Sequence, residues 1–163
     1  MDPFAAFDQV QQDQLYQDWQ QHHHHYLTHF FCALDEQAQT IIPWEIGFMK
    51  KDKITVFTSL PDGTIIIKPA DEVFKKQTDT VEELHLSAVH CTWEQAQAQS
   101  QKQFPLLYPK EQRGDGFVIL QNWQGTTVWN FTFISKTFKF LNLKLNAQTG
   151  QIFEHQDIDL IQK

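Results

Sequence analysis

The first part of the chain carries large side chains at helical spacing. From residue 4 to residue 34 there is no Pro or Gly, and the large side chains recur every three or four positions. Spacings of three and four place side chains on one face of an α-helix, so the pattern predicts a single long helix over residues 4–34. The stripe consists of Leu15, Trp19, His23, Tyr26, Phe30 and Leu34.

A strand-like pattern begins at Trp44. Three short segments are rich in β-branched and aromatic residues, which is typical of strands. Pro61 and Gly63 predict a tight turn before the third of them, because Pro fixes φ and Gly accepts a positive φ. After the third strand we expect two helical turns over residues 70–76 and a polar connector over residues 77–83. The three expected strands are 44–49, 53–59 and 64–68.

The second half of the chain opens with a helix-start signal. Thr92 and Gln95 fit a capping box, in which the two side chains bond to exposed backbone N–H groups. The pattern predicts a helix from Thr92 to about Gln103, ending before Pro105. Strands follow, joined by short connections. They are expected over residues 117–121, 126–134, 138–146 and 151–154.

The two halves have a similar order of elements. The pattern Trp-x-x-x-Phe-hydrophobic-x-Lys occurs at residues 44–51 and again at 129–136. Such a match arises from a divergent duplication, or by chance between two amphipathic hairpins. The expected fold class is α+β, with helices packed on one face of antiparallel β-sheet in two similar helix-then-strands halves. We expect residues 1–80 to form an N-terminal helix plus a three-stranded half, and residues 81–163 to form the C-terminal half.

A short motif near the end of the chain resembles a known family. Residues 143–152 read Leu-Lys-Leu-Asn-Ala-Gln-Thr-Gly-Gln-Ile, and they follow a helix opening at Thr92 and a Trp129-Asn130-Phe131 strand. Over residues 92–154 this arrangement resembles a PepSY domain, with Asn146 in place of the acid that usually opens the final turn. The resemblance implies a helix packed on an antiparallel sheet. PepSY modules occur in propeptides of thermolysin-type peptidases and in envelope proteins, so it also implies a module that binds or restrains a partner, with no catalytic residues.

The charge balance narrows the class of partner. Thirteen Lys and Arg residues against 20 Asp and Glu give a net charge of −7 and a pI near 5.5. Affinity for nucleic acids and anionic membranes depends on clustered cations, so we expect neither as a partner. The first residues lack the regions of a signal peptide, and no apolar run approaches the roughly 20 residues that span a bilayer. We therefore expect a cytoplasmic protein whose partner is another protein.

Four consecutive histidines and a fifth nearby form a candidate metal site. In a continuous helix His22, His25 and His29 fall on one stripe, within about 60° of one another. Imidazoles in this arrangement can ligate zinc or copper. The stripe contains no acidic residue or Cys to complete such a site. The alternative interpretation is a solvated flank rich in Gln and His.

Catalytic chemistry has little support in the sequence. Cys91 lies at the expected start of a helix, where the pKa of a thiol can be lowered, whereas Cys32 lies in an apolar run, where Cys acts as a small apolar residue. There is no phosphate loop, dinucleotide-binding fingerprint or Gly-x-Ser-x-Gly elbow. We expect neither an enzyme nor a bound cofactor.

The expected hairpin tip at residues 121–125 offers a contact for a partner. Trp123 lies between Asn122 and Gln124, where an indole is difficult to bury and is well suited to anchor an interface. The alternative is that the indole packs over the hairpin end. We expect a non-catalytic protein-binding or regulatory protein of the inhibitor or immunity type. The alternative function is a small-ligand or transition-metal-binding protein that uses the histidine stripe.

Overall fold

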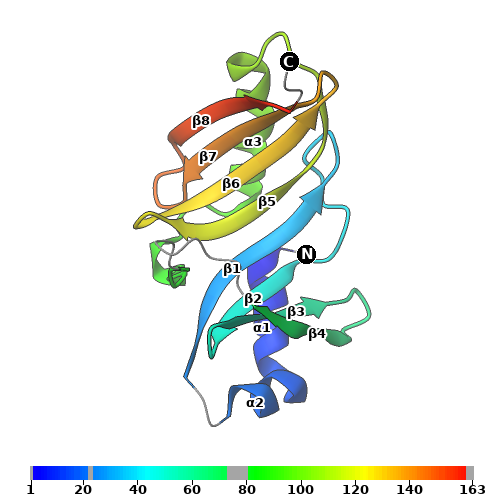
Figure 1. Cartoon of the computed structure of the whole chain (residues 1–163), viewed down its shortest axis with the longest axis vertical. Helices are drawn as coiled ribbons and strands as arrows, with labels where there is room; N and C mark the ends of the chain where they lie inside the picture. Colours follow the sequence, from blue (N-terminus) through cyan, green and yellow to red (C-terminus); the bar gives the residue numbers. More distant parts are fainter. Residues whose placement is uncertain (1, 22–23, 73–80, 161–163) are drawn as a thin grey trace.

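The strands of this chain join into one antiparallel sheet. The computed structural model describes residues 2–21, 24–72 and 81–160. Within them the strand order is β4-β3-β2-β1-β5-β6-β7-β8, and neighbouring strands are antiparallel (Figure 1). In chain order the elements are α1 (Pro3–Gln12), α2 (Gln14–Gln20), β1 (His25–Leu34), β2 (Glu45–Lys50), β3 (Lys53–Ser59), β4 (Ile65–Glu72), η1 (Leu86–Ala88), α3 (Trp93–Leu107), β5 (Arg113–Trp123), β6 (Thr126–Ser135), β7 (Lys139–Asn146) and β8 (Ile152–Asp159).

The expected fold class is wrong. The sequence predicted two halves in which helices pack on separate runs of strands, whereas one sheet continues through the pairing of β1 with β5. Among the described residues, more lie in strands than in helices. An unpaired strand edge exposes a row of N–H and C=O groups, and the β1–β5 pairing satisfies both inner edges at once. The division into residues 1–80 and 81–163 stays a prediction.

The single helix predicted over residues 4–34 is wrong in its second part. Asp13 adopts an extended conformation after α1, and its carboxylate accepts a hydrogen bond from the first turn of α2. The chain beyond α2 forms β1, in which Phe30, Cys32 and Leu34 are all fully buried. Phe30 and Leu34 are four residues apart, a spacing that places side chains on one face of a strand as well as of a helix. The stripe therefore could not distinguish the two structures.

The predicted elements of the second half are closer to the structure. The capping box is confirmed, because the Thr92 hydroxyl accepts from the Gln95 N–H at 3.1 Å and the Gln95 side chain accepts from the Thr92 N–H at 2.9 Å. The helix continues to Leu107, with Pro105 inside its last turn. In the first half, residues 70–72 continue β4 instead of forming a helical turn. The remainder of that expected helix, residues 73–76, lies outside the described residues.

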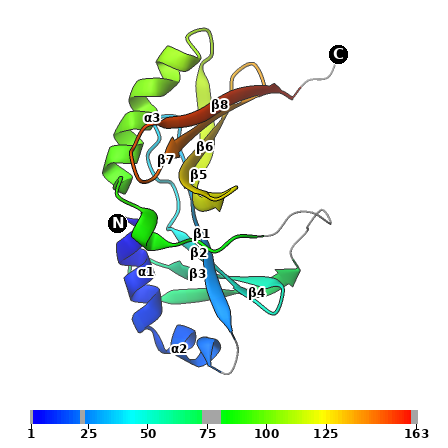
Figure 2. The ribbon, with the colours of Figure 1, turned by 90° about the vertical axis from the view of Figure 1, so that its left-hand side faces the viewer.

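The helices lie on one face of the sheet. Figure 2 shows α1 and α3 on the same side, with the opposite face turned away from both. Alternate strand residues form the core beneath them, and Trp129, Phe131 and Phe133 of β6 have no exposed surface. We call the opposite surface the helix-free face. None of the helices in the described residues has the length and apolarity needed to cross a bilayer.

Candidate binding site on the helix-free face

The sheet divides at a fork where β1 and β5 separate. The two strands pair as far as His29 and Gln121. Beyond that point the chain around Leu84 runs beside β1, and the Leu84 N–H donates to the Leu27 carbonyl at 2.8 Å. Leu84 is buried and holds this segment against the core. The fork is therefore a fixed feature in which three pieces of chain meet.

The fork contains a cavity of ≈ 680 Å³. This volume lies in the range of roughly 300–1,000 Å³ that is typical of ligand sites. Apolar side chains come from β1, β3 and β5. Amide groups come from the end of β5 and the turn after it, and one carboxylate comes from the segment before η1. The lining residues are Thr28, His29, Phe31, Ile54, Val81, Glu82, Ile119, Gln121, Asn122, Trp123 and Gln124.

His29 contributes a neutral imidazole to the cavity lining. Its ring lies directly against the backbone of Gly47, where a Cβ atom would be 2.2 Å from His29 Cε1. The ring nitrogen Nδ1 is 2.7 Å from the Thr28 hydroxyl oxygen. Burial lowers the pKa of His29 to about 4, and the carboxylate of Glu45 opposes that shift only in part. At neutral pH the imidazole therefore offers hydrogen bonding without a charge.

Replacing Gly47 with alanine is expected to displace the imidazole. The added methyl group cannot share its space with the His29 ring, and overpacking of this kind costs about 1–3 kcal/mol of unfolding free energy. Urea denaturation measures the loss. In the double variant Gly47→Ala/His29→Ala the methyl group has room, so the loss should be smaller than the sum of the two single effects. Simple additivity of the two losses would show that the ring does not occupy this position.

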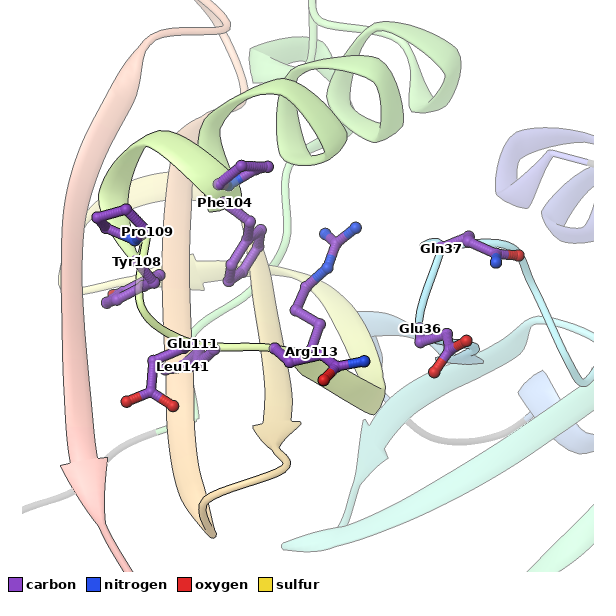
Figure 3. A pocket seen from close by; sticks show the side chains of 10 residues that line it. Glu36, Gln37, Phe104, Tyr108, Pro109, Glu111, Arg113 and Leu141 are labelled. Atoms are coloured by element: carbon purple, nitrogen blue, oxygen red, sulfur yellow. The ribbon is translucent and has the colours of Figure 1, made fainter.

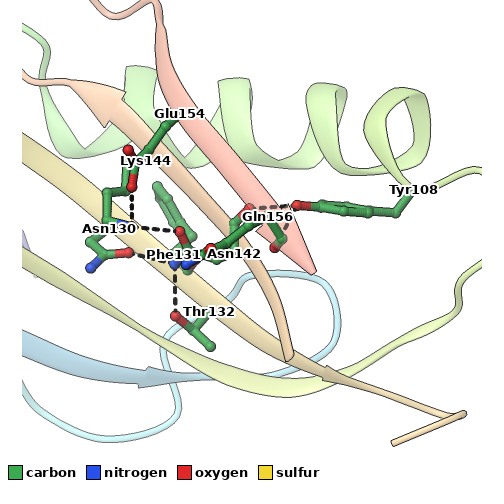
Figure 4. Close-up of polar contacts among 8 residues, drawn as sticks. All are labelled: Tyr108, Asn130, Phe131, Thr132, Asn142, Lys144, Glu154 and Gln156. Carbon is green, nitrogen blue, oxygen red and sulfur yellow. Dashed lines mark hydrogen bonds and ion pairs between the residues drawn. The ribbon is translucent and has the colours of Figure 1, made fainter. Parts of the chain in front are cut away.

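A buried polar cluster holds a cation against the Trp123 ring. Lys144 is 2% exposed, and its Nζ donates to Asn142 Oδ1 at 2.8 Å and pairs with the Glu154 carboxylate at 2.9 Å. The same Nζ lies 4.7 Å from the centroid of the Trp123 ring, within the range of a cation–π contact. Figure 4 shows the cluster between β6, β7 and β8. The indole therefore rests on a support that is itself fixed.

Asn142 connects this cluster to the strands beside it. Its Nδ2 donates to Asn130 Oδ1 at 2.7 Å, to the Phe131 carbonyl at 3.0 Å and to Thr132 Oγ1 at 3.1 Å. The backbone carbonyl of Asn142 accepts from the Tyr108 hydroxyl at 2.7 Å, as does that of Gln156 at 2.8 Å. Because buried polar groups that are fully hydrogen-bonded define a unique geometry, the cluster fixes β6, β7 and β8 relative to one another.

The structure brings the three predicted hairpin residues together at the cavity. Trp123, Asn122 and Gln124 all line it, and the indole is half-buried. The Asn122 side chain accepts from the Gly125 N–H at 2.9 Å, and its amide donates to the Glu83 carbonyl at 3.2 Å. Gln124 and Gly125 both have positive φ, as a tight two-residue hairpin requires. These three residues therefore form one wall of the cavity, and their role in binding stays a prediction.

Sequence reasoning missed the other walls. His29 was read as a metal ligand, and Phe31, Ile54 and Glu82 had no assigned role. These residues come from three separate parts of the chain, and only the sheet pairing places them beside the hairpin. The one local signal was Gly47, a glycine inside a strand, which often marks a close approach of another group.

The predicted histidine stripe is not present in the described residues. His25 packs among rings on the helix side, with centroids 6.0 Å from Tyr16 and 5.3 Å from Trp19, whereas His29 faces the cavity. A register shift in β1 just before His29 separates the two faces. His22 lies outside the described residues. Within residues 2–21, 24–72 and 81–160 no three His, Cys, Asp or Glu side chains are grouped to hold a metal ion.

Both thiols are buried and protonated at neutral pH. Burial raises the pKa of Cys32 to about 12, and the thiol donates to the Ile42 carbonyl at 2.9 Å. Burial also raises the pKa of Cys91, which overrides the lowering expected at a helix start. Cys91 accepts the indole N–H of Trp129 at its carbonyl oxygen, 3.0 Å away. The geometry around each cysteine is that of a core residue.

Comparisons with known proteins give a likeness of fold. No family model matches the chain, and no curated protein matches it. A solved structure of a putative lipoprotein from Clostridium difficile 630 has a TM-score of 0.55 to this chain at 9% sequence identity, covering 88% of each chain. At this identity the likeness concerns the fold alone. The chain therefore has the fold of that protein, and the resemblance of residues 92–154 to PepSY domains finds no family model to support it.

Proposed function

We propose that this chain is a non-catalytic binding protein whose fork cavity receives a large apolar side chain of a protein partner. The observation that carries the proposal is the meeting of Trp123, Asn122 and Gln124 with an apolar floor in one cavity of ≈ 680 Å³. A rigid aromatic anchor beside amide groups is typical of energetic centres in protein interfaces.

The charge of the fork cavity indicates what kind of partner segment it can bind. Among the described residues that line the cavity, Glu82 contributes the one carboxylate, and His29 is neutral because burial lowers its pKa to about 4. The whole chain carries a net charge of −7. A partner segment with a Lys or Arg next to its apolar anchor complements this surface and is steered toward it.

The resemblance of residues 92–154 to PepSY domains is retained as part of this proposal. In that family the module binds or restrains a partner, which agrees with a binding role for the helix-free face. A regulatory role of the inhibitor or immunity type follows from the same resemblance. The cytoplasmic setting expected from the sequence is retained as part of the proposal, since the lipoprotein neighbour bears on the fold alone.

Selection of peptides from a random displayed library against the wild-type protein tests the proposal. We expect enriched peptides to combine a large apolar residue with an adjacent Lys or Arg. Fluorescence anisotropy of one such peptide should show binding about 30-fold weaker with Trp123→Ala, because removal of an interface anchor typically costs about 2 kcal/mol. Glu82→Gln should weaken binding mainly at low salt.

Phe153→Ala is the matched control, since Phe153 is an exposed aromatic on β8, three strands away from β5 in the sheet. It should leave peptide affinity unchanged. Equal affinities of wild type and Trp123→Ala, or a library that yields no enriched peptide, would show that the fork is not a protein-binding site.

A small apolar molecule is the second candidate occupant, favoured by the size of the cavity. Native mass spectrometry separates the two. Retention of a molecule of a few hundred daltons by wild type, and its loss from Trp123→Ala, would favour a small ligand over a peptide.

A further inference from the structure

Arg113 is the one arginine in the sequence, and it lines a second pocket. The pocket has a volume of ≈ 340 Å³ and lies between the end of α3, the start of β5 and the loop after β1 (Figure 3). It shares no lining residue with the fork cavity. Anything it binds is therefore separate from the proposed protein-binding role.

The guanidinium of Arg113 is buried at one of its nitrogen atoms and is not fully hydrogen-bonded. Its Nη1 is buried and has no hydrogen-bond partner among the described residues. Two aromatic rings support it, with centroids 5.1 Å (Phe104) and 4.8 Å (Phe133) from Cζ. Burial lowers the pKa of Arg113, although the group stays charged. A buried donor without an acceptor is costly, so the group is poised to bind one.

The neighbouring carboxylates are engaged elsewhere. Glu36 pairs with Lys136 at 3.7 Å. Glu111 pairs with Lys139 at 3.4 Å and accepts from the Thr137 hydroxyl at 2.6 Å. Asp35, whose charge raises the pKa of Arg113, uses Oδ1 to accept two backbone N–H groups of its own turn at 2.9 Å each. The acceptor that Arg113 lacks is thus not supplied by these three groups.

We propose that this pocket binds a carboxylate attached to an apolar group, with the carboxylate on the Arg113 guanidinium. The planar fork of a guanidinium matches a carboxylate in two parallel hydrogen bonds. The walls of Phe104, Tyr108 and Leu141 suit an aliphatic or aromatic body. Because Glu36 and Glu111 also line the pocket, a singly charged carboxylate fits there better than a doubly charged phosphate.

The single arginine provides a direct reporter for this proposal. In a ¹⁵N-labelled wild-type sample one Arg Nε–H signal is expected. Hexanoate and phenylacetate should shift it in a saturable way, and their primary amides should not. A short peptide ending in Phe, with a free or an amidated C-terminus, distinguishes a polypeptide end from a free acid as the source of the carboxylate. Inorganic phosphate should bind at least about tenfold more weakly than phenylacetate, from the charge argument above.

Two variants should change the carboxylate affinity in opposite directions. Arg113→Lys keeps the charge but loses the fork, so carboxylate affinity should fall about tenfold. Glu36→Gln removes a repelling charge and should tighten binding a few-fold, which a purely structural arginine does not predict. Phe153→Ala is the unaffected control. The proposal is overturned if no carboxylate gives a saturable shift, if amides bind as well as acids, or if phosphate binds best. These outcomes do not depend on whether the fork binds peptides.

Discussion

Trp129→Ala is expected to lower the free energy of unfolding by about 3–5 kcal/mol, the usual cost of truncating a fully buried large aromatic side chain. Trp129 has no exposed surface and is in contact with rings from three separate parts of the chain. The centroid distances are 6.5 Å to Phe4 of α1, 6.4 Å to Trp44 before β2 and 5.6 Å to Trp93 of α3. Its indole N–H donates to the Cys91 carbonyl, which the variant leaves without that donor.

Urea denaturation followed by both fluorescence and circular dichroism measures this loss. Because Trp129 links α1 to α3 across the continuous sheet, wild type and variant should each unfold in one transition that coincides in both signals. Phe153→Ala is the control, since that ring is exposed on β8 and its loss should cost less than about 1 kcal/mol. A Trp129→Ala protein that unfolds in two separate steps would contradict the single cooperative core.

Local signals predicted the second half of the chain better than the first. The capping box at Thr92 and Gln95 satisfies backbone groups within four residues, so it can be read directly from sequence. The stripe ending in Phe30 and Leu34 had no such terminal signal before it, and spacing of four residues fits a strand as well as a helix. This segment forms a strand because it pairs with β2 and β5, which lie later in the chain.

The continuous sheet had no local signal at all. Two runs of strands were visible in the hydrophobic pattern, but their union depends on the pairing of β1 with β5, which are separated in the chain by residues 35–112. Long-range pairing of this kind is set by the compatibility of two whole edges rather than by any short motif. The sequence therefore predicted the strands more successfully than the sheet.

The residues of the candidate sites also differ in whether a local sequence signal marks them. Trp123, Asn122 and Gln124 could be proposed from sequence because a local turn signal places them at the end of a tight hairpin. His29 was placed on a helix, so its contact with Gly47 could not be foreseen. Arg113 could not be predicted as a site residue, because a single arginine forms no sequence pattern, and only its buried Nη1 atom marks the second pocket.

His29 should make the protein less stable in mild acid. Burial lowers its pKa in the folded state to about 4, against an ordinary value of 6.5. Between these values the unfolded chain takes up a proton that the folded chain refuses, so stability is full above pH 6.5 and declines as the pH falls toward 4. At about 1.4 kcal/mol for each pKa unit, the loss attributable to His29 is about 3 kcal/mol.

Urea denaturation of wild type and His29→Gln at intervals from pH 7 to pH 4 isolates this contribution. Asp62 and Glu111 also have lowered pKa values, and they destabilise both proteins in acid to the same extent, because the substitution leaves them in place. The difference in stability between wild type and variant should therefore shrink by about 3 kcal/mol over this range. A difference that stays constant with pH would mean that the imidazole is solvated, and that the fork cavity presents a charge to its ligand in mild acid.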